Sequence, residues 1–388
     1  MAIDKVNFRV ATYNVENLFN RSKILNLKDH SEIQRLLALT RTLQGLLDSV
    51  EYTPEIKRGI EQVSAELFGY IDVRADVGGL GSWPDQGAPG PYRLKRHIKG
   101  RADWSGEIAF KDMPLNDEQR MNTARIIQAV NADLLCITEA EGMTALDNFN
   151  RNALGGLYKE FALLDSINDA RGIDVGCFSK WPIQSMRTNM FKRRAAPHER
   201  SPLFSRDCLE VTVTTPSGKP IHMFCNHFKS QRGKTDNEKA DAADWRKEQA
   251  VAVRDIALSY DLSREWLVVA GDLNEDSNNE FQSLRSLFDC KELVPVVDPT
   301  LPFRERFTHT TFDPRWRAHK VSQLDYLFVS KPLAERMTNH GFNRRGTWEL
   351  KANAQEIGID PIEPIPEITS EAVNASDHCA LWADFDLS

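Results

Sequence analysis

The stretch LVVAGDLNEDSNN (267–279) passes from an apolar strand pattern directly into an acidic, amide-rich loop. Gly, Asp and Asn are ordinary turn residues, because they tolerate the backbone angles of a turn and form local hydrogen bonds. Alone, this stretch therefore indicates a strand followed by a turn. Whether Asp272 and Asn274 also carry chemistry depends on what lies at the ends of the other strands.

The chain alternates strand patterns with helical patterns. Besides 265–273, strands are predicted for FRVATYNV (8–15), DLLCIT (133–138), IDVGCFS (173–179), CLEVTVTT (208–215), PIHMFCNHF (220–228), QLDYLFVS (323–330) and CALWADF (379–385). Apolar residues at helical spacing predict helices over 121–130 and 241–258. TPSGK (215–219) has the composition of a hairpin turn, so the prediction is an α/β protein whose sheet is at least partly antiparallel.

More than a hundred residues separate the first strand from the second. A helical pattern over 33–50 starts at a predicted capping box, Ser31 to Gln34. A second helical pattern follows Thr53-Pro54, where proline suits the first turn of a helix. We expect the two helices to pack as a hairpin, and the Gly- and Pro-rich stretch 78–93 to form an irregular surface loop.

The composition is that of an ordinary globular protein of 388 residues, long enough for one large core with an insertion. The net charge is −7, so no global basic field attracts nucleic acid. A polyanionic substrate would require a local basic patch or a metal ion.

The N-terminus lacks an apolar targeting segment, and no stretch approaches the roughly 18 apolar residues of a membrane span. We therefore predict a cytoplasmic protein without a membrane partner. The six cysteines include no C-x-x-C pair and lie mostly in apolar runs, which predicts reduced core residues rather than disulfides or a zinc site.

Polar side chains lie at the ends of most predicted strands. They are Asn14 and Glu16 after the first strand, Glu139 and Glu141 after the second, His227 at the fifth, Asp272 and Asn274 after the sixth, and Asp377-His378 before the last. Strand ends on one edge of a sheet converge in space. Their oxygen ligands are those that Mg²⁺ prefers, so this convergence predicts a hard-metal and phosphate site.

Hydrolysis of a phosphodiester requires charge neutralisation, a base for water and stabilisation of the leaving oxygen. Glu139, Asp272 and His378 could meet these needs. Asp325 lies inside an apolar strand, where an unpaired charge is costly. Pairing with His378 would offset that cost and hold the imidazole in one orientation.

Seven strings in this order along the chain together resemble the endonuclease/exonuclease/phosphatase superfamily, which includes pancreatic-type deoxyribonucleases, AP endonucleases, neutral sphingomyelinases and inositol polyphosphate phosphatases. They are TYNVENLF (12–19), DLLCITEAE (133–141), RGIDVGCFSKWPI (171–183), NHFKSQRG (226–233), GDLNEDS (271–277), QLDYLFVS (323–330) and SDHCAL (376–381). Each string alone is weak, but all of them in family order are specific. The resemblance covers 8–19, 120–184, 205–290 and 305–388.

The resemblance implies a four-layer α/β sandwich, in which two packed mixed β-sheets are flanked by helices. The whole chain, 1–388, would form a single domain of this kind, with 20–119 as a long helical insertion after the first strand. Nothing in the sequence assigns the insertion a role, and a substrate lid, a partner surface and an oligomer contact all stay open.

The resemblance also assigns roles to the residues at the strand ends. Asn14, Glu139 and Asp377 would lie at the metal, with Glu139 as the direct carboxylate ligand. Glu16 falls where some members have a further acidic residue. The ion would be Mg²⁺, with Mn²⁺ as the alternative.

The catalytic roles follow in the same way. Asp272 would orient or deprotonate the attacking water, and Asn274 would position that water and a phosphate oxygen. His378, held by Asp325, would contact the scissile phosphate. His227 would contact the phosphate or help to protonate the leaving group, the alternative being a core histidine bonded to backbone. Family members differ in the general base, which stays open here.

Two departures from the family pattern matter. Family members usually have L-Q-E at the metal glutamate, whereas this chain has Ile137-Thr138-Glu139. AP endonucleases carry Tyr where this chain has RGID (171–174), and they lack the His of NHF (226–228). The resemblance is therefore closer to the deoxyribonuclease and sphingomyelinase branches.

The other charged residues near the motifs have simpler interpretations. We expect Glu141, Glu275 and Asp276 to be solvated, and Arg171 with Asp174 to form either a surface ion pair or part of the site. Basic and aromatic residues on the motif loops could form a phosphate-binding rim. They are Lys192, Arg193, Arg194, Lys229, Arg232, Lys234, Arg315, Trp316 and Arg317.

The leading functional hypothesis is a Mg²⁺- or Mn²⁺-dependent phosphodiesterase, a nuclease acting on DNA or RNA. The alternative is the same chemistry on a small phosphoester such as a phospholipid headgroup, a phosphoinositide or a nucleotide. A non-catalytic binding module is a third class, but every expected polar position is filled. The oligomeric state cannot be predicted.

Overall fold

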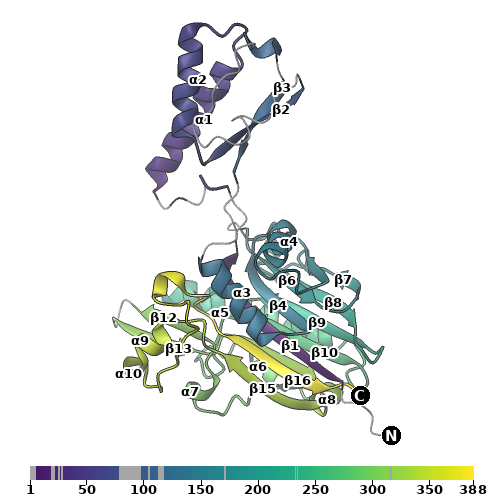
Figure 1. Cartoon of the computed structure of the whole chain (residues 1–388). Coiled ribbons are helices and arrows are strands. Elements are labelled where there is room, and N and C mark those ends of the chain that lie inside the picture. Colours follow the sequence, from purple (N-terminus) through teal and green to yellow (C-terminus); the bar gives the residue numbers. More distant parts are fainter. Residues whose placement is uncertain are drawn as a thin grey trace. The chain divides into compact units, whose positions relative to one another are not determined.

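The computed structural model describes residues 6–18, 22–24, 27, 29–77, 98–103, 105–111, 118–169, 172–231, 233, 235–313 and 317–388. The chain divides into two compact units. The larger comprises residues 1–19 and 115–388, and the smaller comprises residues 20–114 (Figure 1).

The larger unit is built on two six-stranded sheets. The first sheet has the order β15-β16-β1-β4-β6-β5 and the second has the order β11-β14-β10-β9-β8-β7. In the first sheet the strands are Met337–Asn343, Ala380–Asp386, Asn7–Leu18, Leu134–Ala140, Asp174–Ser179 and Glu160–Leu163. In the second they are Leu293–Pro295, Asp325–Ser330, Trp266–Asp272, Pro220–His227, Cys208–Thr214 and Ile183–Arg187.

Both sheets are mixed. β1 is parallel to β4 and β9 is parallel to β10, whereas the other neighbouring strands run antiparallel. β1 and β16 come from opposite ends of the chain yet lie side by side, as the purple and yellow strands of Figure 1.

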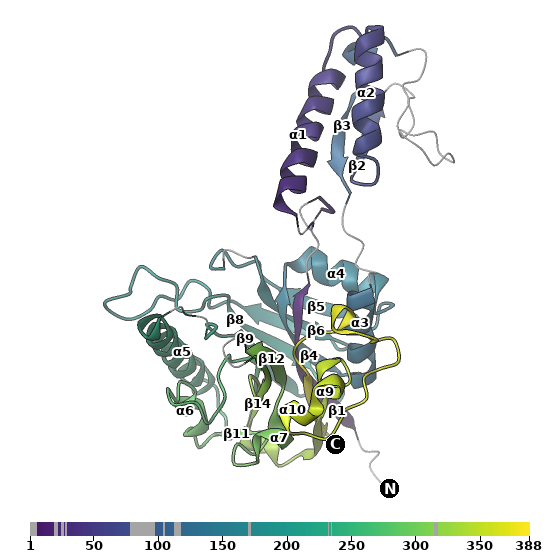
Figure 2. The ribbon, with the colours of Figure 1, turned by 90° about the vertical axis from the view of Figure 1, so that its left-hand side faces the viewer.

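Four layers follow from which apolar side chains meet. Val10 and Leu134 of the first sheet share one buried cluster with Met223 and Val268 of the second, so this cluster is the core between the sheets. Helices α3 (Glu118–Val130) and α4 (Met143–Asn152) cover the outer face of the first sheet, and α5 (Asp236–Ala257) and α6 (Arg285–Phe288) cover that of the second (Figure 2). The predicted four-layer sandwich is confirmed.

Smaller elements complete the unit. They are α7 (Phe303–Arg306), the hairpin β12 (His309–Asp313) and β13 (Ala318–Ser322), α8 (Lys331–Ala334), α9 (Glu349–Ala352), α10 (Ala354–Ile357) and the 3₁₀ turn Glu371–Val373. The hairpin β12-β13 forms its own two-stranded sheet.

The strongly apolar strands were predictable and the short peripheral ones were not. All eight predicted strands and both predicted sandwich helices are present. The hairpin at 215–219 is closed by the Thr215 N–H, which donates to the Lys219 carbonyl at 3.2 Å. Within the larger unit, the sequence prediction missed β5, β7, β11, β12, β13 and β15, which are short or largely polar and lack a long apolar run, and it also missed the two strands of the smaller unit.

The smaller unit contains helices α1 (His30–Leu47) and α2 (Pro54–Glu66), the hairpin β2 (Ile71–Val77) and β3 (Ser105–Phe110), and the 3₁₀ turn Arg101–Asp103. Leu43 of α1, Ile60 of α2 and Ile71 of β2 lie in one buried cluster. An ion pair at 2.6 Å joins Arg35 of α1 to Glu66 of α2. The predicted helical hairpin is therefore present, with a core of its own.

Two details of the predicted helices need correction. The N-cap of α1 is Asp29, whose carboxylate accepts hydrogen bonds from the Ser31 and Glu32 N–H groups, so the predicted capping box from Ser31 was wrong. The helix ends at Leu47, and Val50 is exposed. Thr53 caps α2 with proline in its first turn, as predicted. The predicted loop 78–93 lies outside the described residues.

All six cysteines are unpaired and buried, in agreement with the prediction of reduced core residues. Within the described ranges, every helix is too short or too polar to cross a lipid bilayer.

Gly271, directly before Asp272, lies in close contact with the neighbouring strand β9. Its φ is +136°, and a Cβ at this position would lie 1.9 Å from the Asn226 carbonyl oxygen on β9. We expect Gly271→Ala to lower the free energy of unfolding by more than about 3 kcal/mol, because both strain and a backbone clash must be relieved. Urea unfolding monitored by tryptophan fluorescence measures this.

Gly218→Ala is the matched control, since Gly218 has φ +80° but open space around it. Strain alone is expected to cost about 1 kcal/mol there. Equal losses for the two variants would show that the contact with Asn226 is not the constraint.

Candidate active site

Three polar side chains form one row at the end of the second sheet. Asp272, the last residue of β10, is in register with His227 on parallel β9 and with Asp325 on antiparallel β14. All three are buried. The Nε2 atom of His227 lies 3.5 Å from Oδ2 of Asp272.

The first sheet supplies the opposing side chains. Nδ2 of Asn14 on β1 donates to Oδ2 of Asp272 at 3.1 Å, which links the two sheets. Nε2 of His378, just before β16, lies 3.8 Å from the same oxygen. Oε1 of Glu139 on β4 lies 3.8 Å from Nε2 of His227. Residues far apart in sequence therefore meet where the ends of the two sheets join.

Unusual backbone geometry accompanies these side chains. Glu16, Glu139 and Asn274 have positive φ angles of 49°, 69° and 56°. The register of β1 shifts after Asn14, and that of β4 shifts around Glu139. Such conformations cost roughly 1–3 kcal/mol each and concentrate at functional sites, where the surrounding structure holds them.

His378 is held by the carboxylate that the sequence suggested. Its Nδ1 lies 2.7 Å from Oδ2 of fully buried Asp325, whose own N–H donates to Thr308 Oγ1. Burial lowers the pKa of His378, but attraction to Asp325 outweighs it and raises the pKa well above its usual value. The imidazole is thus fixed in orientation, with Nε2 directed toward Asp272.

Asp272 is a buried carboxyl group at the centre of these contacts. Its burial raises its pKa to about 7, although the positive charge of His378 acts in the opposite direction. The Asn274 N–H donates to Oδ1 of Asp272 at 2.8 Å, and the Asn274 side chain donates to the Phe228 carbonyl. The loop after β10 is therefore locked against the end of β9.

Glu16 and Asp377 form a second acidic pair beside Asn14. The Asp377 N–H donates to Oε2 of Glu16 at 3.1 Å. Burial, reinforced by the charge of Asp377, raises the pKa of Glu16 to about 7. Burial acts likewise on Asp377, but the nearby His309 imidazole and the charge of His378 outweigh it and lower its pKa to about 2.

The sequence prediction missed His309, which belongs to this site. The Thr310 N–H donates to the Asp377 carbonyl and the Cys379 N–H to the Thr308 carbonyl, so β12 is bonded to the chain around His378. The donor atoms of His309, Asp377 and His378 lie within 4.8 Å of one another. The only sequence signal was a histidine in a short polar strand before QLDYLFVS.

Glu275 and Asp276 were wrongly expected to be solvated. Oε2 of Glu275 accepts from Arg246 Nη2 at 2.9 Å and from Ser283 Oγ at 2.7 Å, and both partners of the ion pair are 1% exposed. Asp276 pairs with buried Arg306 at 2.9 Å. These two acids hold the loop after β10 in place.

Only some of the basic side chains predicted to form a phosphate-binding rim are exposed. Arg194 is buried and pairs with Glu248 at 2.8 Å, while its guanidinium lies 4.9 Å from the ring centre of Trp245. Nζ of Lys229 lies 5.1 Å from the same ring. Lys192, Arg193 and Arg317 are exposed. Arg171, Arg232, Lys234, Arg315 and Trp316 lie outside the described residues.

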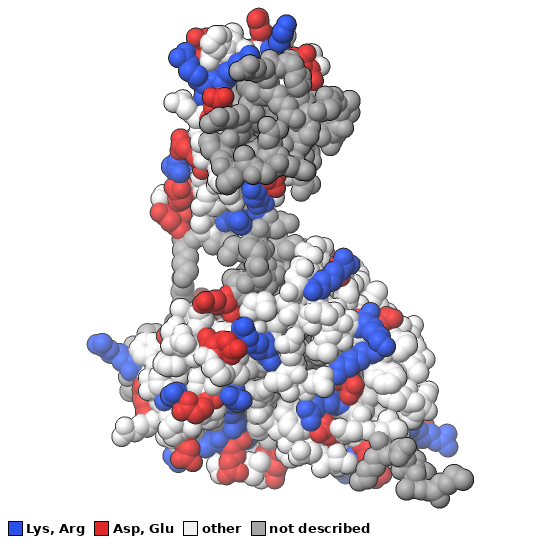
Figure 3. All heavy atoms as spheres, in the orientation of Figure 1, with Lys and Arg blue, Asp and Glu red and all other residues white. Residues whose placement is uncertain are grey.

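Asp174 is buried, and its carboxylate accepts a hydrogen bond from the Ser166 N–H at 3.0 Å. Figure 3 shows acidic and basic side chains interspersed on the face of the larger unit that it draws, in keeping with the small net charge.

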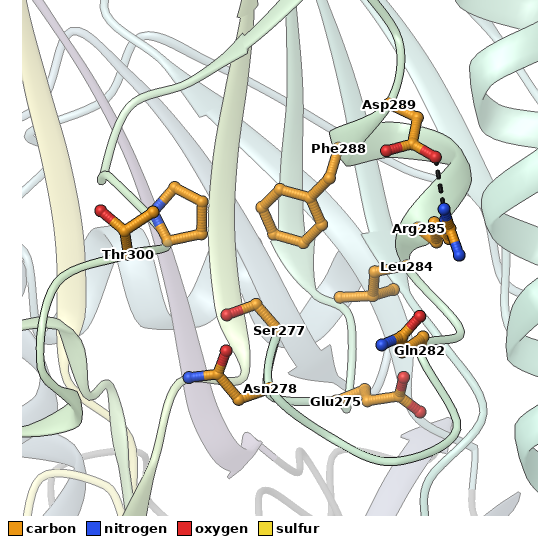
Figure 4. Close-up of a pocket in the computed structure, with 10 residues that line it drawn as sticks. Glu275, Ser277, Asn278, Gln282, Leu284, Arg285, Phe288, Asp289 and Thr300 are labelled. Carbon is orange, nitrogen blue, oxygen red and sulfur yellow. Dashed lines mark hydrogen bonds and ion pairs between the residues drawn. The ribbon is translucent and has the colours of Figure 1, made fainter.

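A pocket of about 340 Å³ lies beside the loop after β10. Phe288 and Leu284 supply apolar surface, and Ser277, Asn278 and the ion-paired Arg285 supply polar groups (Figure 4). None of the residues predicted for the site lines it. The converging strand ends, rather than this pocket, are the candidate active site.

This chain is similar to one protein family and to several solved structures. The Endonuclease/Exonuclease/phosphatase family model matches residues 114–378. The human Nocturnin catalytic domain with bound sulfate anion has a TM-score of 0.47 at 17% identity, over 70% of this chain and 86% of that one. Truncated TDP2 from Caenorhabditis elegans gives 0.47 at 16% identity, over 70% and 92%.

A family protein from Bacteroides thetaiotaomicron gives a TM-score of 0.48 at 14% identity, over 99% of this chain and 100% of that one. None of the curated protein sequences matches this chain.

The ion pair between Arg246 and Glu275 yields a prediction about stability. We expect Arg246→Met to lower the free energy of unfolding by about 3–5 kcal/mol, because Glu275 would remain buried without its partner. The double variant Arg246→Met/Glu275→Leu should lose less, since no unpaired charge remains. Urea unfolding measures both. A cost below about 1 kcal/mol for Arg246→Met would mean that solvent screens the pair.

Proposed function

This chain belongs to the Endonuclease/Exonuclease/phosphatase family, and we propose that it is a divalent-metal-dependent phosphodiester hydrolase that cleaves DNA or RNA. Family membership implies a phosphoester hydrolase. The observation that carries the proposal is the hydrogen bond between Asn14 and Asp272, which brings the polar ends of both sheets to one place.

The donor set fits a hard divalent cation. Glu16, Glu139 and Asp377 offer carboxylate oxygens and Asn14 an amide oxygen, the ligand types that Mg²⁺ and Mn²⁺ accept. Burial, with the charge of Asp377 adding to it, raises the pKa of Glu16, and a cation beside the two carboxylates would favour their ionised forms. A bound ion would supply charge neutralisation at the phosphate.

The protein groups around this centre have distinct proposed tasks. Asp272, with its pKa near 7, can accept a proton from an attacking water, and Asn274 positions that water. His378, held by Asp325, donates from Nε2 to a phosphate oxygen. His227, which is in register with Asp272, would assist the leaving oxygen.

A polynucleotide substrate is supported by the neighbourhood of His227. Lys229 follows it by two residues, and the Lys229 N–H is fixed by the side chain of Gln249. Its ammonium group lies over Trp245, so a cationic and an aromatic group lie together beside the chain segment that follows His227. Phosphate charge and base stacking are what such a pair recognises in nucleic acid.

Hydrolysis assays test the proposed reaction. Single- and double-stranded DNA, RNA and bis-p-nitrophenyl phosphate are offered with Mg²⁺, Mn²⁺ or EDTA, to wild type and to Glu139→Gln. We expect metal-dependent cleavage of a polynucleotide that falls by at least about 10²-fold in Glu139→Gln, because a carboxylate donor is lost. EDTA should abolish turnover.

Activity on bis-p-nitrophenyl phosphate without cleavage of any polynucleotide would favour a small phosphoester as substrate. Equal activity of wild type and Glu139→Gln would show that the site assignment is wrong. No metal-dependent turnover on any substrate would contradict the hydrolase proposal.

Lys229→Met tests the substrate class separately. We expect a rise in KM for a polynucleotide and a reduction of about one in the slope of log affinity against log salt, because one phosphate contact is lost. Hydrolysis of bis-p-nitrophenyl phosphate should be unchanged. Lys247→Met is the matched control, since Lys247 is an exposed lysine on α5 that pairs with Asp244. Identical effects of the two variants would refute a specific contact.

A further inference from the structure

His309 is held in a fixed place by backbone pairing on both sides. It is in register with Ser322 on β13, and it forms an isolated β-bridge with His378. The rings of His309 and His378 are packed with their centres 4.6 Å apart. Its side chain is 15% exposed, so the ring is largely sequestered yet accessible to a small ion.

The two ring nitrogens of His309 face different groups. Nδ1 lies 3.4 Å from Oγ of Ser322, a hydroxyl that can accept a proton carried on Nδ1 or donate to Nδ1. A proton on Nδ1 leaves a lone pair on Nε2, the nitrogen that faces Asp377. Imidazoles that bind metals characteristically donate their other N–H to such a partner, which fixes the tautomer.

The separation between His309 and Asp377 suits two ligands of one ion. Nε2 of His309 lies 3.7 Å from Oδ2 of Asp377, which is longer than a good hydrogen bond. Two donors that bind one ion at about 2.0–2.2 Å lie about 3 to 3.5 Å apart, so a shift of a few tenths of an ångström would bring both onto it. The other Asp377 oxygen faces Nε2 of His378 at 3.8 Å.

His378 has different engagements from His309. Its Nδ1 is bonded to Asp325 at 2.7 Å, and its Nε2 lies near Asn14 and Asp272 as well as Asp377. Nε2 of His309 therefore faces the acidic cluster of Asp377 and Glu16. Its Nδ1 contacts a hydroxyl, whereas Nδ1 of His378 is bonded to a carboxylate.

We propose that His309 supplies a nitrogen ligand to the divalent cation held by Asp377, and that this centre therefore selects Mn²⁺ over Mg²⁺. The inference rests on the metal site of the proposed function and adds the identity of its ion. Mg²⁺ takes oxygen ligands almost exclusively, whereas first-row transition ions accept imidazole. One nitrogen among oxygen donors thus shifts the preference toward Mn²⁺.

Direct metal binding to the full chain, without substrate, tests the proposal. Mn²⁺ binding is followed by electron paramagnetic resonance, and Mg²⁺ binding by calorimetry, for wild type and for His309→Phe, which keeps a ring against His378. We expect the Mn²⁺ dissociation constant to rise by at least about tenfold in the variant while that of Mg²⁺ changes by less than about threefold. Pulsed resonance should show ¹⁴N coupling to Mn²⁺ in wild type and none in His309→Phe.

His222→Phe is the matched control, because His222 is also a half-buried imidazole packed against a ring, that of Tyr260 at 4.8 Å. It should bind both ions as wild type does and keep the nitrogen coupling. Absence of ¹⁴N coupling in wild type would overturn the proposal. So would coupling that persists in His309→Phe, or parallel losses of Mn²⁺ and Mg²⁺ affinity, which would indicate that His309 only positions Asp377.

The readouts separate this inference from the proposed function. Nitrogen coupling in a protein that cleaves no phosphodiester would remove the hydrolase proposal and leave the ligand assignment intact. Metal-dependent cleavage without nitrogen coupling would remove the ligand assignment and leave the hydrolase proposal intact.

Discussion

The hydrogen bond from Asn14 to Asp272 is the interaction on which the rest of the site depends, because it is made between the two sheets. Each sheet by itself carries only part of the chemistry. Register along β9, β10 and β14 aligns His227, Asp272 and Asp325, and the core between the sheets fixes the distance at which the first sheet meets this row. The apolar core is therefore also what sets the geometry of the polar site.

That geometry brings several carboxyl groups close together, and their pKa values differ widely. Burial raises the pKa of Asp272 and of Glu16 to about 7, while imidazole partners lower that of Asp377 to about 2. A carboxyl group whose folded pKa exceeds its unfolded value destabilises the fold as pH rises from about 4 to about 7. The two raised groups thus oppose folding at neutral pH, and a bound cation would relieve that opposition by favouring their ionised forms.

Sequence patterns predicted what depends on local order and missed what depends on partners distant in sequence. Apolar runs predicted the eight main strands, and polar residues at their ends indicated a candidate site, because strand ends of a layered α/β fold converge. Glu275 was misassigned since its partner Arg246 lies 29 residues earlier. Arg246 does occupy the apolar face of α5, four residues after Ala242 and four before Ala250, and a charge in that position indicates a buried partner. His309 had no comparable signal, because β12 lacks an apolar run.

The apolar residues of the smaller unit form a core of their own. Leu36, Leu43 and Ile60 pack with one another, and none of the three cores of the sandwich includes a described residue from 20–114. The chain leaves the sandwich after Leu18 and returns to it at α3. The Arg120 side chain of α3 donates to the Asn17 carbonyl and so connects these two points of the chain. An element with its own core, inserted between two anchored positions, can vary in length and sequence at little energetic cost to the rest of the fold. The strand ends of the sandwich bring the proposed catalytic groups together, and the insertion begins six residues after Asn14, the residue that links the two sheets.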